Sequence, residues 1–170
     1  MITQIDFSIL DFIQQHLTNP VADVIMTVIT HLGDYGILWV VLCIALLCRK
    51  ETRKCGIALA VAMAAGLIIC NIVLKNLVAR TRPFIQGAVP ILINPPMGHS
   101  FPSGHTTNSF IAATVISMNY KKYSTAAFAL AALISFSRIY LYVHYPSDVI
   151  AGAVLGAVIG YGTVKLSDKL

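Results

Sequence analysis

The sequence predicts an all-α membrane protein, a polytopic bundle of about six transmembrane helices with an N-terminal helix in the membrane interface. Three observations support this. Hydrophobic residues make up 57% of the 170 residues and charged residues only 11%, and the mean hydropathy of +0.78 is far above that of soluble domains. Uncharged apolar runs recur, and the run 55–74 reaches the roughly 20 residues that a helix needs to cross hydrocarbon. Basic residues occur as short clusters between these runs.

The first element expected is the interfacial helix, within residues 5–17. Ile5, Leu10 and Ile13 alternate with Asp6 and Asp11 in a roughly helical pattern. The two carboxylates interrupt the opening, which favours a retained segment over a cleaved signal peptide.

Six spans are expected after it. The first, 21–32, follows Pro20, a residue suited to the first turn of a helix, although it contains Asp23 and His31. The shorter runs are adequate if each helix extends into the interface with polar residues on its end turn. The remaining expected spans are 35–48, 55–74, 106–120, 123–137 and 149–164.

The distribution of lysine and arginine predicts the orientation, because loops retained in the cytoplasm carry the excess of positive charge. With six spans, eight basic residues fall on one side: Arg49, Lys50, Arg53, Lys54, Lys121, Lys122, Lys165 and Lys169. Four fall on the other: Lys75, Arg80, Arg82 and Arg138. This predicts a multi-pass protein of the cytoplasmic membrane with both termini inside.

The chain is expected to form one domain over residues 1–170. The net charge of +5 does not indicate nucleic-acid binding, because the basic residues lie between apolar runs and not along one face. The cysteines show no metal-site or disulfide spacing and are predicted to be buried thiols: Cys43, Cys48, Cys55 and Cys70.

The four basic residues on the outer side coincide with the polar motifs of the chain. In "KNLVARTRP", Lys75 and Arg82 would share one face of a helix that continues out of 55–74 and ends at Pro83. Two cations would then project the same way. An isolated Lys and Arg at a helix end also occur as simple anchors among lipid headgroups.

The second motif is "PSGH", at residues 102–105. Ser103 is suited to cap the following helix, and Gly104 allows a ligand to approach the backbone closely where first-turn amides form an anion site. His105 lies beside them. An ordinary serine-capped helix with an interfacial histidine explains the tetrapeptide equally well.

The third motif is "SRIYLYVHYPSD", at residues 137–148. Arg138 offers a planar fork for phosphate oxygens, and His144 precedes a helix with Asp148 in its first turn. A carboxylate bonded to one ring nitrogen would leave the other free as a nucleophile or base. Alternatively, Asp148 only complements the helix dipole.

Together the three motifs indicate a site for a phosphoryl group. Phosphoryl transfer needs stabilisation of the equatorial oxygens, an in-line nucleophile and an acid for the leaving oxygen, and each role has a candidate. No cluster of carboxylates is available for a metal, so neither metal nor cofactor is expected. Spacing alone leaves the roles of the two histidines open.

The three motifs resemble the signature blocks of the type 2 phosphatidic acid phosphatase family, which shares its site with vanadium haloperoxidases. The resemblance implies that His144 attacks phosphorus, that Asp148 orients it, and that His105 protonates the leaving oxygen and then activates water. It also implies that five residues hold the phosphate: Lys75, Arg82, Ser103, Gly104 and Arg138.

The function expected is that of a metal-independent membrane enzyme which removes phosphate from a lipid phosphate or diphosphate at the outer face. Undecaprenyl diphosphate is the favoured substrate, and phosphatidylglycerol phosphate and phosphatidic acid are alternatives. Membrane lipids are the other expected partners. An anion transporter is a remote alternative, because it predicts repeats or broken helices that the sequence does not display. The roles of Asp34, His31, His99 and Arg80 stay open.

Overall fold

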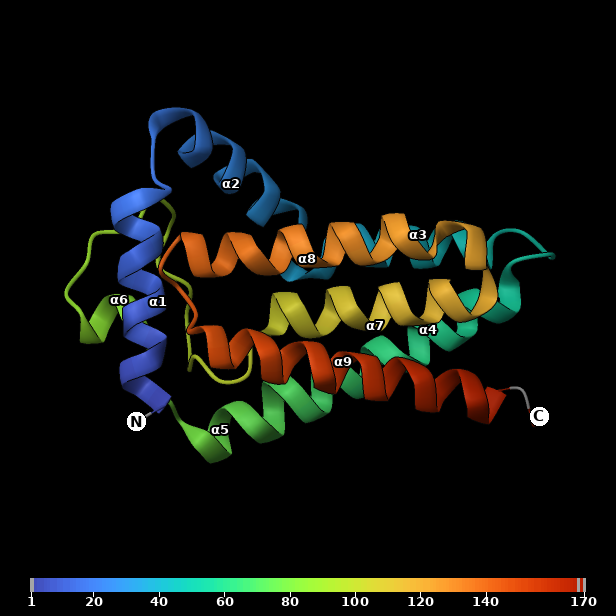
Figure 1. The fold of residues 1–170 in the computed structure, drawn as a ribbon. Coiled ribbons are helices and arrows are strands. Elements are labelled where there is room, and N and C mark those ends of the chain that lie inside the picture. The colour runs from blue at the N-terminus through green and yellow to red at the C-terminus, as the bar shows by residue number, and fades with distance from the viewer. Residues whose placement is uncertain (1, 168, 170) are drawn as a thin grey trace.

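The protein is all-helical, as predicted. The computed structural model describes residues 2–167 and 169, and these contain no strand. Figure 1 shows most helices running lengthwise in one bundle, with the first lying across one end. The α-helices are α1 (Ile2–His16), α2 (Pro20–Leu32), α3 (Ile37–Leu47), α4 (Arg53–Gly66), α5 (Lys75–Val78), α6 (Pro83–Gln86), α7 (Gly104–Asn119), α8 (Ser124–Tyr140) and α9 (Pro146–Ser167).

Helix α1 crosses the end of the bundle with a polar residue on its inner side. Asp6, Leu10 and Ile13 are its buried residues. The opposite face exposes large apolar side chains: Ile2, Ile5, Ile9 and Phe12. An apolar outward face on a helix that lies across the bundle end favours the predicted interfacial position.

The expected hairpin between the first two spans is wrong. α2 and the segment Asp34–Leu47, which includes α3, meet at only 40°, so the chain continues in nearly one direction. Residues of α2 and α3 contact the other helices at successive positions from one end of the bundle to the other. Tyr140 at the end of α8 bonds Asp23, His105 at the start of α7 packs on Gly33, and Gly56 near the start of α4 bonds Cys43.

The chain therefore passes through the bundle along α2–α3, α4–α5, α7, α8 and α9, and not as six antiparallel spans. By length and hydropathy, Arg53–Gln86 and Pro146–Ser167 could each cross a membrane, and the bent pair supplies a third candidate. Figure 1 shows α1 and the C-terminal end of α9 at opposite ends of the bundle, which differs from the expectation that both termini share one side.

The basic residues are still divided between the two ends of the bundle when α2 and α3 form one passage. The α3–α4 connection, the short helix Lys121–Tyr123 between α7 and α8, and the C-terminal end of α9 all lie at the end opposite α1 (Figure 1). These segments carry the eight basic residues grouped above. Lys75, Arg80, Arg82 and Arg138 belong to the α1 end.

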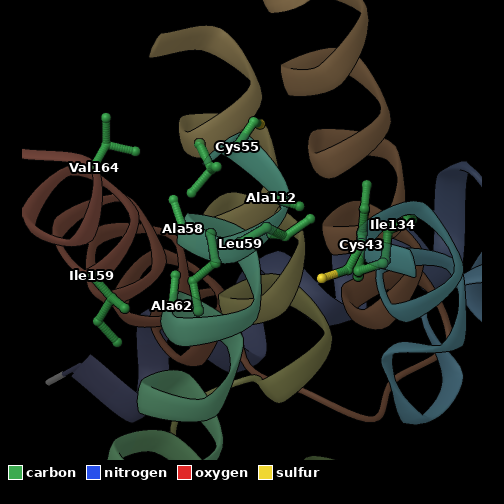
Figure 2. Close-up of a cluster of buried hydrophobic side chains, with 12 residues drawn as sticks. Cys43, Cys55, Ala58, Leu59, Ala62, Ala112, Ile134, Ile159 and Val164 are labelled. Atoms are coloured by element: carbon green, nitrogen blue, oxygen red, sulfur yellow. The ribbon is translucent and has the colours of Figure 1, made fainter. Parts of the chain in front are cut away.

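The largest hydrophobic cluster joins α3, α4, α7, α8 and α9 (Figure 2). Trp39 is only 2% exposed within it, and its indole N–H donates to Ser109 Oγ at 3.2 Å. Three of the four cysteines are buried free thiols as predicted: Cys43, Cys55 and Cys70. Cys48 is exposed, because it follows the last turn of α3 at the bundle end.

Glycines allow α7 and α9 to approach closely. A Cβ atom at Gly156 would lie 2.4 Å from the carbonyl oxygen of Thr107, and one at Gly152 would lie 2.8 Å from that of Ser103. Real side chains could not occupy these places without moving a helix. Small residues at four-residue spacing are a common means of packing helices in membranes, and here they hold α9 against the start of α7.

The single passage of α2 and α3 leads to a topology prediction. In a Cys48→Ser background, cysteines placed at Thr18 and Gln86 should react with an impermeant maleimide from the same side of the membrane. A cysteine at Lys50 should react only from the other side. If Thr18→Cys and Lys50→Cys are labelled from the same side, α2 and α3 are separate spans and the single passage is wrong.

Candidate active site

The three sequence motifs meet at the α1 end of the bundle. Backbone hydrogen bonds join them: the N–H of Ser103 donates to the carbonyl of Asp148 at 3.2 Å, and the N–H of Ser100 donates to that of Arg80 at 2.8 Å. The start of α7, the start of α9 and the segment after α5 are thereby held together.

The first motif does not form one continuous helix, contrary to expectation. The long helix that begins as α4 passes through a π-helical segment, Leu67–Leu74, and ends with α5 at Val78. Ala79 then adopts a left-handed conformation with φ of 48°, and Arg82 is extended. Lys75 and Arg82 therefore reach the site from different directions and do not share a helix face.

Arg82 is buried among backbone carbonyls. Its Nε donates to Gly98 O at 3.0 Å, Nη2 to Met97 O at 3.1 Å and Nη1 to Val143 O at 3.0 Å. Nη1 also lies 3.2 Å from Nε2 of His144. A guanidinium has five N–H donors, so at most one remains free.

These contacts fix the tautomer of His144. A guanidinium can only donate, so Nε2 of His144 must carry its lone pair and Nδ1 its proton. Nδ1 faces the other way, 3.4 Å from Asp148 Oδ2 and 3.4 Å from Ser100 Oγ. The unprotonated nitrogen therefore points toward the cation of Arg82.

Ser100 is a member of the site that sequence reasoning missed. Its hydroxyl donates to Oδ2 of Asp148, which also accepts the N–H of Tyr145 at 3.0 Å. The carboxylate of Asp148 is fully buried. No spacing rule indicated Ser100, because it lies in the irregular segment before α7 and reaches Asp148 only in three dimensions.

His144 lies in the loop between α8 and α9, with 2% of its surface exposed. Burial lowers the pKa of His144 well below its ordinary value of 6.5. Its bond with Asp148 opposes this, whereas the charges of Arg82 and Arg138 lower the pKa further. The imidazole is therefore neutral at neutral pH.

The start of α7 has the capped geometry that the sequence predicted. Ser103 is extended, and its Oγ accepts from the N–H of Thr106 at 3.5 Å. The N–H of Ser103 is already bonded to Asp148 O, but the N–H groups of Gly104 and His105 have no partner among residues 2–167 and 169. Free amides at a helix N-terminus favour an anion.

His105 is held by a carboxylate from the bend between α2 and α3. Its Nε2 lies 3.0 Å from Asp34 Oδ1, and Nδ1 of the exposed His31 lies 2.6 Å from Asp34 Oδ2. The sequence left the role of Asp34 open. The bend, with left-handed Tyr35 and Gly36, directs the carboxylate toward α7.

Arg138 is the cation with the most free donors. It is 2% exposed, its Nη1 donates to Thr30 Oγ1 at 2.6 Å, and its Nε has no partner among the described residues. It interacts electrostatically with both His105 and His144. The charge of Arg138 therefore acts on both histidines.

The half-buried Lys75 is near the same point, since a Cβ atom at Gly104 would lie 3.7 Å from its Nζ. Within the described part of the chain, neither Lys75, Arg82 nor Arg138 has a carboxylate within ion-pair distance. The same residues contain no group of three or more His, Cys, Asp or Glu side chains placed to hold a metal. The site thus presents cations and amides to a ligand, as an anion requires.

Comparison with known proteins agrees with this chemistry. A sequence profile of the PAP2 superfamily matches residues 56–170. The chain belongs to the PAP2 superfamily. Helices α1, α2 and α3 lie before the matched region, so Asp34 and His31 are not part of it.

Relatives in this superfamily act on lipid phosphates. An undecaprenyl-diphosphatase of Sulfolobus acidocaldarius is 33% identical over 141 residues, 81% of this chain and 68% of that protein. Undecaprenyl-diphosphatase BcrC of Bacillus subtilis is 31% identical over 152 residues, 89% and 78% of the two chains. The crystal structure of a phosphatidylglycerolphosphate phosphatase of Bacillus subtilis matches with a TM-score of 0.83 and 25% identity, covering 99% of this chain and 87% of that one. The present chain is a membrane PAP2 phosphatase that hydrolyses lipid phosphate.

The contrast between paired and unpaired arginines leads to a stability prediction. In the absence of anions, Arg138→Met should raise Tm by about 2–6 °C, because it removes a buried charge that has no acid partner. Arg80→Met should instead destabilise by about 3–5 kcal/mol, because Arg80 is ion-paired with Asp6 and Asp148 and its loss leaves them uncompensated.

Vanadate provides the second half of the measurement. It should raise the Tm of the wild type and have little effect on Arg138→Met, because a ligand stabilises only the protein that binds it. A lower Tm for anion-free Arg138→Met would show that the guanidinium is structural.

Proposed function

We propose that this protein hydrolyses a lipid phosphate or diphosphate through a phosphohistidine on His144. The observation that carries the proposal is the position of His144. One ring nitrogen faces Asp148 and Ser100, and the other is an unprotonated nitrogen beside Arg82, within reach of the charge of Arg138.

In the first step, the lone pair of Nε2 forms a bond to phosphorus and the bond from phosphorus to the leaving oxygen breaks. The leaving group is a lipid monophosphate when the substrate is a diphosphate and a lipid alcohol when it is a monophosphate. Lys75, Arg138 and the free amides of α7 stabilise the equatorial oxygens. As Nε2 uses its lone pair, the Arg82 N–H that faced it becomes free to bind a phosphoryl oxygen. Asp148 stabilises the positive charge that develops on the imidazole ring.

His105 supplies the proton for the leaving oxygen in the first step. In the second step it takes a proton from water, whose oxygen attacks phosphorus and releases His144 with its lone pair restored. Asp34 holds Nε2 of His105, which leaves Nδ1 as the nitrogen for this exchange. The support for the role of His105 is its bond to Asp34, whose carboxylate stabilises the protonated ring, and its position in the first turn of α7 beside the free amides.

The outer face of the cell membrane is the proposed location of the site. Its support is the distribution of charge, because the end opposite the site carries eight of the twelve basic residues. In this orientation α1 lies on the outer surface beside the site, and the C-terminal end of α9 lies at the cytoplasmic face.

Undecaprenyl diphosphate is the proposed substrate. Two relatives that are 33% and 31% identical to this chain over the aligned residues are named undecaprenyl-diphosphatases. A site at the outer face is also where a polyprenyl diphosphate carrier is released. Phosphatidylglycerol phosphate is the second candidate, because the phosphatase of that name covers 99% of the chain in structure.

Trapping the intermediate tests the roles of the histidines. With nitrophenyl phosphate, whose leaving group needs little protonation, a rapid quench in alkaline denaturant with excess EDTA should trap an acid-labile, base-stable phosphoenzyme in His105→Ala. None should form in His144→Ala, because the nucleophile is missing. Phosphoenzyme in His144→Ala but not in His105→Ala would reverse the assignment. Failure to form it in EDTA, with recovery on adding Mg²⁺, would count against a metal-independent site.

A panel of lipid phosphates tests the substrate. Phosphate release by the purified enzyme should give the highest kcat/KM with undecaprenyl diphosphate, ahead of phosphatidylglycerol phosphate and phosphatidic acid. The matched control is undecaprenyl monophosphate, which has the same chain without the diphosphate. A higher kcat/KM for phosphatidylglycerol phosphate would replace the proposed substrate and leave the proposed chemistry intact.

A further inference from the structure

Helix α1 places a buried carboxylate beside the site. Asp6 is 3% exposed, although it lies on a helix whose outer face is apolar. Its Oδ1 accepts the N–H of Ser147 at 2.9 Å, and its Oδ2 accepts the hydroxyl of Ser147 at 2.6 Å and Nη2 of Arg80 at 2.7 Å. Asp6 thus bonds the first turn of α9 and one arginine, and it precedes the PAP2 match.

Arg80 links this carboxylate to Asp148. Its Nη1 donates to Asp148 Oδ1 at 2.6 Å and to Ser147 Oγ at 2.8 Å. The guanidinium carbon lies 3.7 Å from the centre of the Tyr145 ring, so the group is also held from one face. Among residues 2–167 and 169, Arg80 is the only Lys or Arg within ion-pair distance of Asp148.

The two oxygens of Asp148 therefore have separate partners. Oδ1 bonds Arg80, and Oδ2 faces Ser100, the N–H of Tyr145 and His144. A carboxylate can rotate about its Cβ–Cγ bond, and a bond to one oxygen fixes where the other points. Asp6 holds the second arm of the same guanidinium, so Arg80 cannot pivot away.

We propose that Asp6 and Arg80 are positioning residues for Asp148, and that α1 is thereby a functional part of the enzyme without touching substrate. The inference rests on the proposed function, in which Asp148 orients the nucleophile His144. Losing Arg80 frees Asp148 Oδ1 and weakens the hold on Nδ1 of His144. Losing the Asp6 carboxylate weakens the bonds to Ser147 and frees the second arm of Arg80, but it leaves the pair between Arg80 and Asp148 in place. The effect on Asp148 is therefore smaller and acts through Arg80.

A purely structural role for α1 gives a different expectation, and the helix offers a matched control. Asp11 accepts the hydroxyl of Tyr142 at 2.8 Å, so it also joins α1 to the loop after α8. Asp11 has no bond to Arg80, Ser147 or Asp148. Asp11→Asn therefore weakens the docking of α1 without altering the contacts of Asp148.

The test compares Asp6→Asn, Arg80→Gln, the double variant and Asp11→Asn in the full-length purified enzyme, with folding checked by Tm and gel filtration. Arg80→Gln should lower kcat and the rate of phosphoenzyme formation by about 10- to 100-fold, the usual effect of losing a partner that orients a reacting group. KM should change by less than about threefold, because no phosphate contact is lost. Asp6→Asn should have the smaller effect, and the double variant should equal Arg80→Gln, because both act through one guanidinium.

Two further results separate positioning from folding. Added guanidinium ions should restore part of the lost kcat to Arg80→Ala and should not change the kcat of Asp11→Asn. The kcat of Asp11→Asn should stay within about twofold of the wild-type value. If Arg80→Gln does not fold, the kcat of Asp6→Asn is compared with that of Asp11→Asn, and a lower kcat in Asp6→Asn supports the positioning role. The inference would be overturned if Asp6→Asn and Arg80→Gln kept the wild-type kcat. It would also be overturned if the two losses of kcat added in the double variant, or if Asp11→Asn lost as much kcat as Asp6→Asn. If the wild type forms no phosphohistidine but the kcat pattern holds, the proposed intermediate is wrong and the positioning role stands.

Discussion

Three buried or half-buried cations without acid partners are the constraint on which this site depends. Moving an isolated charge out of water costs several kcal/mol, and a protein normally compensates the charge or excludes it. Lys75, Arg82 and Arg138 have no carboxylate within ion-pair distance in the described part of the chain. Their mutual repulsion favours binding of an anion between them. The unpaired cations therefore lower the stability of the empty protein and create a binding site for a phosphoryl group.

The fourth cation of this region, Arg80, shows the opposite arrangement. Arg80 is ion-paired with two buried carboxylates, so it has little attraction left for a ligand. The separation is geometric. Arg80 lies on the Asp6 and Ser147 side of Asp148, whereas Arg82 lies on the far side of His144. Carboxylates lie on one side of the imidazole and cations without acid partners on the other. They orient the ring, with its proton toward Asp148 and its lone pair toward the cations.

Much of the site could be predicted from sequence, because its central residues occur in three compact motifs. The tertiary partners could not, since Ser100, Asp34 and Asp6 lie in segments with no recognisable spacing and reach the site only through folding. Arg82 was placed near the site for a partly wrong reason. The sequence indicated a continuous helix face, but the helix ends at Val78 and an extended segment carries the residue.

The expected reversal of the chain between the first two spans is wrong because the chain only bends between α2 and α3. Hydropathy registers an interruption at Gly33–Gly36 and cannot distinguish a reversal of the chain from a bend of 40°. A reversal would have placed Asp34 in an exposed turn outside the bundle. A bend in the middle of a passage instead directs the carboxylate inward, where it meets His105. Polar residues at a break inside a membrane helix are tolerated where they are buried in protein or line a site, so the same break interrupts the span and, through Asp34, holds the second histidine.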